Sequence, residues 1–313
     1  MLNQPGDLYL GIDEHSFSGR DMVLVITEHS SQNVVAVLPN TTKETLKKWL
    51  NNLPPSVMAR IKGLTIDMTG AYKNTVLETL GVQIVTIVDK YHIIQMANNA
   101  LDEVRKMNNW MIHMGIYGHD IIDLRQRKGI KKNNRKRYSR GRRVPLKNYS
   151  KYRKTDTDKQ INIRLYKPNN EVYKPITVQH YLSQTYRTLF LKRQEDLTEK
   201  QKHRLNQILI EFDPLGYICE AYTAKEMITE MMEEKDKEEL ENLLYFLKDT
   251  EHYKLQELYR SLMKWKQEII NYFEHGKTNA RNEGYNNKAK IFKRISYGYK
   301  TKTNYIKKLM FAL

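Results

Sequence analysis

The sequence predicts an α/β protein built on an open, mixed five-stranded sheet, with a large, mainly α-helical insertion before its last helix. The first hundred residues alternate short apolar, β-branched runs with segments of helical periodicity. From about residue 177 to 273 the periodicity is helical throughout. Three closely spaced strands, then helix, strand, helix, strand and helix, is an order typical of mixed sheets covered by helices.

The first three predicted strands span residues 8–13, 22–27 and 34–38. They follow one another so closely that hairpins are the economical connection, and we expect them to pair antiparallel. An amphipathic helix over 42–53 comes next, and Pro54 and Pro55 end it.

Two further strands, at 64–67 and 82–88, complete the sheet. Thr69 can cap a helix over 71–80 between them, and Gly81 can end it. The unbroken apolar run VQIVTIV predicts that the last strand is buried on both faces. A helix from Lys90 to about residue 109 follows it.

Charge and composition narrow the classes of function. Lys and Arg exceed Asp and Glu by 17, which favours a polyanionic partner, with nucleic acid as the first candidate and an anionic membrane surface as the rival. The single cysteine, Cys219, excludes an internal disulfide and a cysteine-based zinc cluster. The N-terminus lacks a signal-peptide pattern, and no apolar run approaches the roughly 18 residues of a membrane span. We therefore expect a cytoplasmic protein.

Residues 125–154 contain fifteen Lys or Arg and no acid. Such a stretch repels itself and stays solvated until an anion neutralises it. We expect it to bind DNA phosphates without reading bases, and a solvated loop with no ligand is the alternative. The side chains expected on the DNA backbone are Arg135, Lys136, Arg137, Arg140, Arg142 and Arg143.

Three carboxylates occupy positions that suit a catalytic metal site. Asp13 ends the first predicted strand, Asp67 ends the fourth, and Glu283 lies near the start of a helix predicted over 282–296. In a sheet of this order the first and fourth strands are neighbours, so both aspartates can meet at one edge. Mg²⁺ prefers oxygen ligands, and two such ions about 3.5–4 Å apart serve phosphodiester chemistry. Each acid alone has a plainer interpretation, as a turn residue, a helix cap or a solvated side chain, and only the joint pattern favours a site.

The helix that carries Glu283 has two distinct faces. One face carries, in order, Glu283, Asn287, Lys290 and Arg294. The opposite face carries Ala289, Phe292 and Ile295. An acid and two cations on one face suit a surface that touches both a metal ion and a phosphate backbone.

These segments match a known pattern. GIDE (11–14), TIDMTGAY (65–72), VDKYHII (88–94) and NEGYNNKAKIFKRISYGY (282–299) together resemble the DDE transposases of bacterial insertion sequences, specifically the ISL3 family. The resemblance covers residues 8–106 and 265–313 well and the middle loosely. It implies a ribonuclease-H-like fold whose helical insertion precedes the last catalytic helix, with the core in 1–106 and 265–313 and the basic loop and insertion in 107–264.

The resemblance also implies an activity. It implies cleavage and strand transfer of DNA at insertion-sequence ends, with Asp13, Asp67 and Glu283 as the catalytic residues and as ligands of two Mg²⁺ or Mn²⁺ ions. Water or a DNA 3′-hydroxyl would be the nucleophile. The implied partners are transposon ends and target DNA, with a homodimer in a synaptic complex as one arrangement, in the nucleoid of a bacterial cytoplasm.

Asp89 and His92 match a further feature of the family, an acid and a histidine three residues apart after the fifth strand. Two interpretations stay open for them. They lie near the active site and position DNA or a carboxylate, or Asp89 caps the next helix and His92 packs beside it. Asn287, Lys290 and Arg294 are expected near the site or on DNA.

The family's N-terminal zinc-binding and helix-turn-helix modules are missing ahead of Asp13. This favours one rival to an active transposase core, a truncated, non-catalytic remnant that only binds DNA, although the three acids oppose it. A separate rival is a ribonuclease-H-like nuclease that cuts branched DNA.

Overall fold

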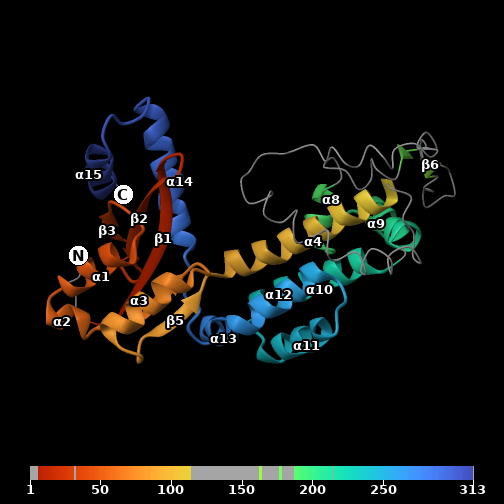
Figure 1. The fold of residues 1–313 in the computed structure, drawn as a ribbon, viewed down its shortest axis with the longest axis horizontal. Coiled ribbons are helices and arrows are strands. Elements are labelled where there is room, and N and C mark those ends of the chain that lie inside the picture. Colours follow the sequence, from red (N-terminus) through yellow and green to blue (C-terminus); the bar gives the residue numbers. More distant parts are fainter. Residues whose placement is uncertain are drawn as a thin grey trace, which may run out of the picture. The chain divides into compact units, whose positions relative to one another are not determined.

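The computed structural model describes residues 6–31, 33–113, 162–163, 176–177, 187–213 and 215–312. Contacts divide the described chain into two compact units (Figure 1). The first takes its residues from 1–96, 227–249 and 256–313, and the second from 97–226 and 250–255. The functional division expected at residues 107 and 264 stays a prediction.

The first unit contains a five-stranded sheet in the order β3-β2-β1-β4-β5. β1 pairs antiparallel with β2, and β2 with β3, whereas the β1–β4 and β4–β5 pairs are parallel. The strands are β1 (Leu8–Ser18), β2 (Asp21–Glu28), β3 (Asn33–Leu38), β4 (Ile61–Ile66) and β5 (Val85–Val88). The predicted mixed sheet is confirmed, and β1 and β4 are neighbours as the two-aspartate hypothesis requires.

β1 is longer than predicted, and the expectation that it ends at Asp13 was wrong. Its pairing with β4 stops at Gly11 opposite Thr65, but β1 continues beside β2, where Asp13 lies opposite Val25. The sequence does not reveal this extension, because the residues after Asp13 are mostly polar. They form a strand only because they pair with β2 in a hairpin. Asp13 therefore lies just past the last β1–β4 pair.

β5 is shorter than predicted. It begins at Val85, because residues 82 and 83 form a turn after Gly81, and the Val82 side chain is 89% exposed. The predicted end of the preceding helix is confirmed, since Gly81 adopts a φ of 102° that favours glycine.

One face of the sheet is covered by α1 (Lys43–Asn51), α2 (Pro55–Met58) and α3 (Gly70–Leu80). Thr42 caps α1, because its hydroxyl accepts the Thr45 N–H. Alternate residues of β1 and β2 point into the core on this side. That core includes Leu10, Ile12, Leu24, Ile26, Leu46, Leu50, Leu64, Ile66, Tyr72, Val76 and Trp265.

The opposite face is covered by α14 (Ala280–Ile295) and α15 (Lys302–Ala312) (Figure 1). The intervening positions of β2 pack against these helices. The second apolar cluster consists of Val23, Val25, Val34, Val37, Ala289, Tyr305 and Leu309. The sheet is thus a middle layer between two layers of helix, and the segment around Glu283 joins the second layer.

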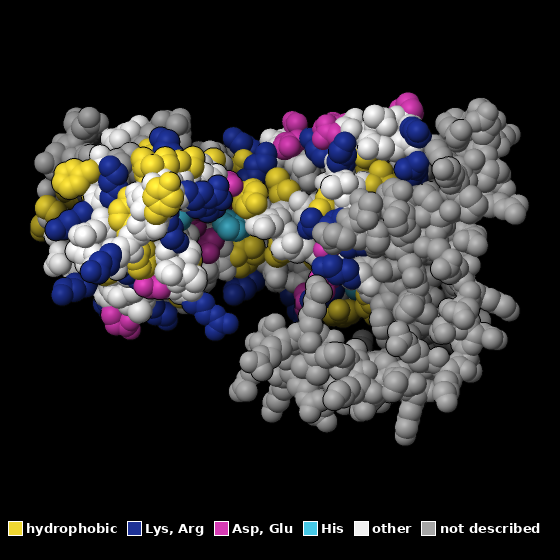
Figure 2. Space-filling model, turned by 90° about the horizontal axis from the view of Figure 1, so that it is seen from above, with side chains coloured by type: hydrophobic (Ala, Val, Ile, Leu, Met, Phe, Trp, Pro, Cys, Tyr) yellow, Lys and Arg dark blue, Asp and Glu magenta, His cyan; other side chains and the backbone are white. Residues whose placement is uncertain are grey.

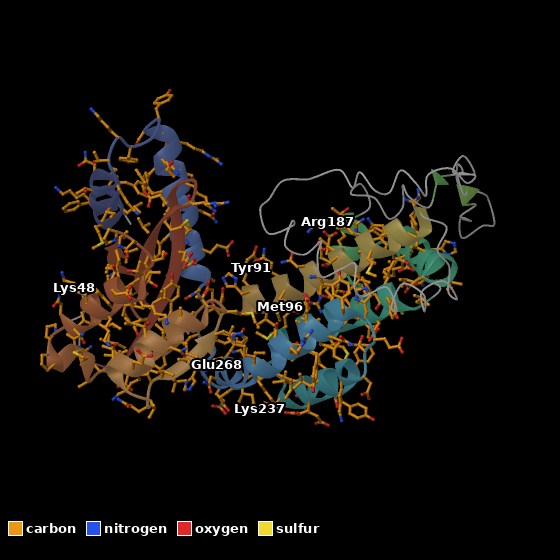
Figure 3. The ribbon with its side chains drawn as sticks, in the orientation of Figure 1. Lys48, Tyr91, Met96, Arg187, Lys237 and Glu268 are labelled. Atoms are coloured by element: carbon orange, nitrogen blue, oxygen red, sulfur yellow. The ribbon has the colours of Figure 1, made fainter. Side chains whose placement is uncertain are left out.

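Helix α13 (Lys266–His275) packs on β5 through polar contacts. The Asn271 side-chain amide donates to the Thr86 carbonyl over 2.7 Å. Glu268, labelled in Figure 3, is buried and pairs with Lys73, while the Thr86 hydroxyl donates to it over 3.2 Å. These bonds fix the helix that leads into α14.

The other helices in the described residues are α4 (Lys90–His113), α8 (Arg187–Leu191), α9 (Glu199–Phe212), α10 (Tyr217–Glu234), α11 (Lys237–Lys248) and α12 (Tyr253–Lys264). In the second unit, Asp102 joins Arg105, Lys106 and Arg187 in ion pairs of 2.8–3.2 Å. β6 (Asn162–Ile163) and β7 (Ile176–Thr177) form a short antiparallel pair. Within the described residues, no helix is long and apolar enough to cross a membrane.

Candidate active site

Four acids come to one edge of the sheet from four separate segments. Asp67 directly follows β4, Asp89 directly follows β5, and Asp13 lies on β1 beyond the end of its pairing with β4. Glu283 lies in the first turn of α14. The two predicted aspartates therefore share an edge, as expected from the strand order, and Asp89 joins them.

Asp13 is partly buried and has two hydrogen bonds on its carboxylate. One oxygen accepts the Glu14 N–H over 2.8 Å, and the other accepts the Asn286 side-chain amide over 2.7 Å. Burial raises the pKa of Asp13 to about 6, and the charges of Asp67 and Asp89 also raise it. The Glu14 N–H and the charge of His92 act in the opposite direction. Carboxylates that raise one another's pKa in this way repel each other, and a bound cation would reduce that repulsion.

Asp89 ties two helices to the end of β5. Its carboxylate accepts the Asn279 N–H over 3.2 Å, just before α14, and also the N–H of Tyr91 at the start of α4. Burial raises the pKa of Asp89 and the charge of Glu283 adds to the rise, although both hydrogen bonds and the charge of His92 lower it. Asp89 thus makes the capping contact with α4 that the sequence allowed. Its pKa also depends on the charge of Glu283. A direct role for Asp89 or His92 on DNA stays a prediction.

The residues that seat α14 on the sheet are amides that sequence analysis did not identify. Asn279 is fully bonded: its Nδ2 donates to the Ile12 carbonyl over 3.1 Å, and its Oδ1 accepts the Thr65 hydroxyl. Asn282, one turn further along, accepts the Thr27 hydroxyl. The signal was present, since residues 279, 282 and 286 have the i, i+3, i+7 spacing of one helix face.

Gly11 allows this close seating. A Cβ at Gly11 would lie 2.7–2.9 Å from side-chain atoms of Thr27, Asn279 and Asn282, closer than such atoms can approach. The start of α14 therefore rests directly on the backbone of β1. Because Glu283 follows Asn282, this contact sets the position of the third acid relative to Asp13.

The donor atoms suit a hard cation, although their side chains are not gathered around one point. Among the described residues, no three His, Cys, Asp or Glu side chains lie in a group that could hold a metal ion. Carboxylate and amide oxygens are the ligands that Mg²⁺ and Mn²⁺ prefer. Asn286 Oδ1 is a buried oxygen that lacks a hydrogen-bond partner in the described part of the chain, and its amide also touches Asp13. The chemistry of the site therefore fits a divalent cation.

The predicted polar face of α14 is exposed along its length: Glu283, Asn287, Lys290 and Arg294 all face solvent. The expected apolar face is correct for Ala289, which is buried, and Phe292, which is partly buried. It was wrong for Ile295, which is 69% exposed. Ile295 is the last residue of α14, where the chain leaves the helix. The structure thus leaves Lys290 and Arg294 outside the core and exposed to solvent, with Lys290 Nζ donating to Asn287 Oδ1 over 3.2 Å.

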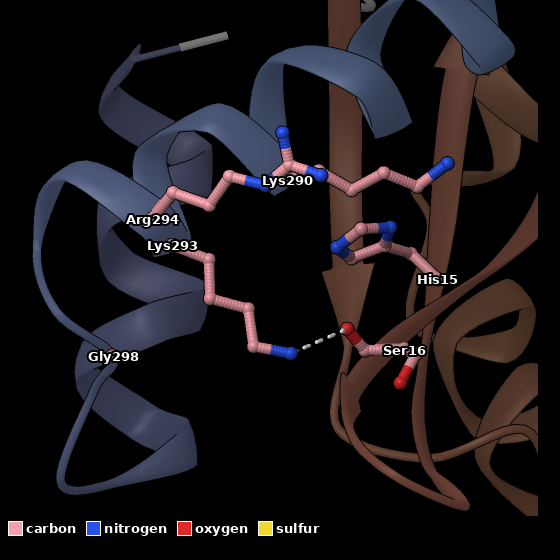
Figure 4. A pocket seen from close by; sticks show the side chains of 6 residues that line it. All are labelled: His15, Ser16, Lys290, Lys293, Arg294 and Gly298. Carbon is pink, nitrogen blue, oxygen red and sulfur yellow. Dashed lines mark hydrogen bonds between the residues drawn. The ribbon is translucent and has the colours of Figure 1, made fainter.

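A cationic hollow lies between the far end of β1 and the second half of α14. It has a volume of about 470 Å³ (Figure 4). Its lining residues are His15, Ser16, Lys290, Lys293, Arg294 and Gly298. Three of the six are cations and none is an acid, so the hollow suits an anion. Lys293 Nζ donates to the Ser16 carbonyl over 3.5 Å, which directs this ammonium group toward β1.

His15 lines the hollow as an uncharged side chain. It is buried, and its Nε2 shares a hydrogen bond with the buried Tyr305 hydroxyl of α15. Burial, and then the charges of Lys293 and Lys290, lower the pKa of His15 to about 4. The ring is therefore neutral at pH 7. Lys and Arg side chains are also scattered over the coloured part of the face in Figure 2, where the residues are described.

Comparison with known protein families covers most of the chain. A family model described as a transposase, of the ISL3 type, matches residues 10–187 and 159–309. The chain belongs to the ISL3 family of transposases. The family predicted from the four sequence segments is thereby confirmed. In this ISL3 transposase the individual roles of Asp13, Asp67 and Glu283 stay predictions.

Among curated proteins, the transposase for insertion sequence element IS1001 from Bordetella parapertussis is 28% identical over 99 residues. The match covers 31% of this ISL3 transposase chain and 24% of that relative. No solved structure matches the chain. Arg135, Lys136, Arg137, Arg140, Arg142 and Arg143, expected on the DNA backbone, lie outside the described residues.

Proposed function

We propose that this ISL3 transposase chain is the catalytic core for DNA transposition, which cuts and joins DNA strands at the ends of an insertion sequence. Asp13, Asp67 and Glu283 would hold two Mg²⁺ or Mn²⁺ ions. The observation that carries the proposal is that acids from β1, β4, β5 and α14 lie at one sheet edge, where the charges of Asp67 and Asp89 raise the pKa of Asp13 and the charge of Glu283 raises that of Asp89. A structural role alone gives no reason to collect like charges.

Each residue of the site has a task in this proposal. Bound ions would activate the attacking oxygen and stabilise the leaving one. Asp13, Asp67 and Glu283 would hold the ions, and because water or a DNA 3′-hydroxyl would be the nucleophile, no covalent bond between protein and DNA would form. Asp89 holds the start of α14 through the Asn279 N–H and so keeps Glu283 near the other acids.

The cationic hollow would hold the DNA backbone beside the reacting phosphate. Lys290, Lys293 and Arg294 form no ion pair with any acid among the described residues, so a phosphate would meet them without displacing a carboxylate. The basic run at 125–154 would extend this contact. The partners are then insertion-sequence ends and target DNA, with a homodimer in a synaptic complex as one arrangement, in the bacterial cytoplasm.

Cleavage of DNA that carries the element ends, by the full chain with Mg²⁺ or Mn²⁺, tests the proposal. We expect Asp67→Asn to lose cleavage by several orders of magnitude, while thermal unfolding and metal-free DNA binding stay as in the wild type. Glu78→Gln, an exposed position on α3, is the matched control and should keep full activity. Cleavage by Asp67→Asn at the wild-type rate would contradict the assignment.

One observation favours a second candidate, a DNA-binding remnant without catalysis. In the described residues the acids do not form a ready metal cluster. A remnant would bind DNA with the strong salt dependence of phosphate contacts, equally in the wild type and in Asp67→Asn. It would cleave no DNA with either ion.

A further inference from the structure

Asn286 has a bonding pattern that packing does not explain. The side chain is only 7% exposed. Its Nδ2 donates to Asp13 over 2.7 Å, but its Oδ1 lacks a partner among the described residues. A buried acceptor without a hydrogen bond destabilises the folded state. An apolar side chain would avoid that cost, so Oδ1 needs another explanation.

Comparison with Asn279 shows that seating the helix is not that explanation. Asn279 uses both polar atoms of its amide to fasten the start of α14 to β1 and β4. Asn279 and Asn282 already hold the start of α14 on the sheet, and among the described residues the Asn286 side chain bonds to no backbone or hydroxyl group. Its bond goes to the carboxylate of Asp13 instead.

The position of Asn286 also relates two of the predicted ligands. It lies three residues after Glu283 on α14, and side chains at this spacing are neighbours on a helix surface. One amide therefore contacts the acid of β1 and adjoins the acid of α14. Nδ2 and Oδ1 belong to one planar amide, so the unpartnered oxygen is only one amide group away from the atom that contacts Asp13.

We propose that Asn286 is a cation-site residue: its Nδ2 positions Asp13, and its Oδ1 offers a neutral oxygen to the divalent cation or to a water bound to it. The inference rests on the proposed function, since it requires a cation among these acids. A neutral oxygen adds a ligand without adding to the repulsion among the carboxylates. Oxygen donors of this kind are common in sites for hard cations.

Calorimetric titration of the full chain with Mn²⁺, without DNA, tests the assignment. We expect Asn286→Ala to weaken Mn²⁺ binding about tenfold or more, as loss of a supporting group at a metal site does. Asn286→Asp keeps an oxygen and should bind Mn²⁺ as tightly as the wild type or more tightly. Its melting temperature without Mn²⁺ should fall, because a new carboxylate then faces Asp13. Asn74→Ala, an exposed asparagine on α3, is the matched control.

The possible results separate the two proposals. If both Asn286 variants bind Mn²⁺ like Asn74→Ala while Asp67→Asn loses it, Asn286 is only a packing residue and the proposed function stands. If the wild type binds no Mn²⁺, both proposals fall. If Asn286→Ala does not fold, Asn286→Asp decides, since a tenfold loss of affinity in that variant would also overturn the role of the oxygen.

Discussion

Gly11 and Asn279 are in such close contact that a single methyl group would separate them. A Cβ on Gly11 would lie 2.8 Å from Asn279 Oδ1. Gly11 precedes Asp13 by two residues on β1, and Asn279 directly precedes the helix that carries Glu283. The spacing between the first and third predicted acids therefore depends on the absence of a side chain at residue 11.

Gly11→Ala should lower the free energy of unfolding by about 1–3 kcal/mol, because the new methyl group forces the Thr27, Asn279 and Asn282 side chains to move. Gly284→Ala is the matched control. The same methyl group at that position of α14 meets nothing within 4 Å and should raise stability by about 0.5–1 kcal/mol. Urea unfolding measures both changes. Equal effects of the two variants would show that α14 does not rest on Gly11.

Lys293→Gln should weaken DNA binding in a salt-dependent manner. If Lys293 meets a phosphate in the cationic hollow, its loss lowers the slope of log K against log salt by about 1. Lys48→Gln is the control, because Lys48 is exposed on α1, over the other face of the sheet (Figure 3). Fluorescence anisotropy with labelled duplex at several salt concentrations, without metal, measures both slopes. Identical slopes for the two variants would show that Lys293 in the hollow does not contact a DNA phosphate.

The stability of the protein should fall with acid partly through His29. Its Nε2 hydrogen-bonds with the Thr65 hydroxyl over 2.8 Å, and burial, then the charge of Lys277, lower its pKa to about 4. Between the unfolded pKa of 6.5 and pH 4 the unfolded chain binds a proton that the folded chain does not. The contribution of the neutral ring to the free energy of unfolding therefore has its full value above pH 6.5. It declines as the pH falls toward 4, by about 3 kcal/mol at most.

His29→Gln should therefore flatten the curve of unfolding free energy against pH between about 6.5 and 4. The measurement is urea unfolding at a series of pH values, for the variant and the wild type. Parallel curves over this interval would mean that His29 carries no such charge penalty in the folded protein.

Sequence periodicity was sufficient to locate the strands along the chain, because apolar alternation and the spacing of turns are local properties. The short turns between the first three strands also predicted their antiparallel pairing. Periodicity was not sufficient for the length of β1. Residues 14–18 are mostly polar, and they belong to a strand only because β2 folds back along them. Val82 shows the converse error, since an apolar residue was assigned to β5 although a turn exposes it.

The acids of the candidate site were predictable, and the amides that support them were not. An acid after an apolar run is a visible pattern, whereas Asn282 and Asn286 on a helix are usually solvated. Their partners, Thr27 and Asp13, are 255 and 273 residues away, a separation that periodicity cannot span. The prediction for Ile295 was wrong for a related reason. The periodicity of a helix shows which residues share a face, but not where along the helix the sheet stops covering that face.

The first turn of α14 is fastened to the sheet by amides and hydroxyls, and not by a plug of apolar side chains. Water can replace such bonds at a net loss of about 0.5–1.5 kcal/mol each, far less than the loss of a core. Release of this turn is thus a local opening that does not require the domain to unfold. The position of the third acid therefore depends on a few polar bonds, and not on the apolar core beneath the sheet.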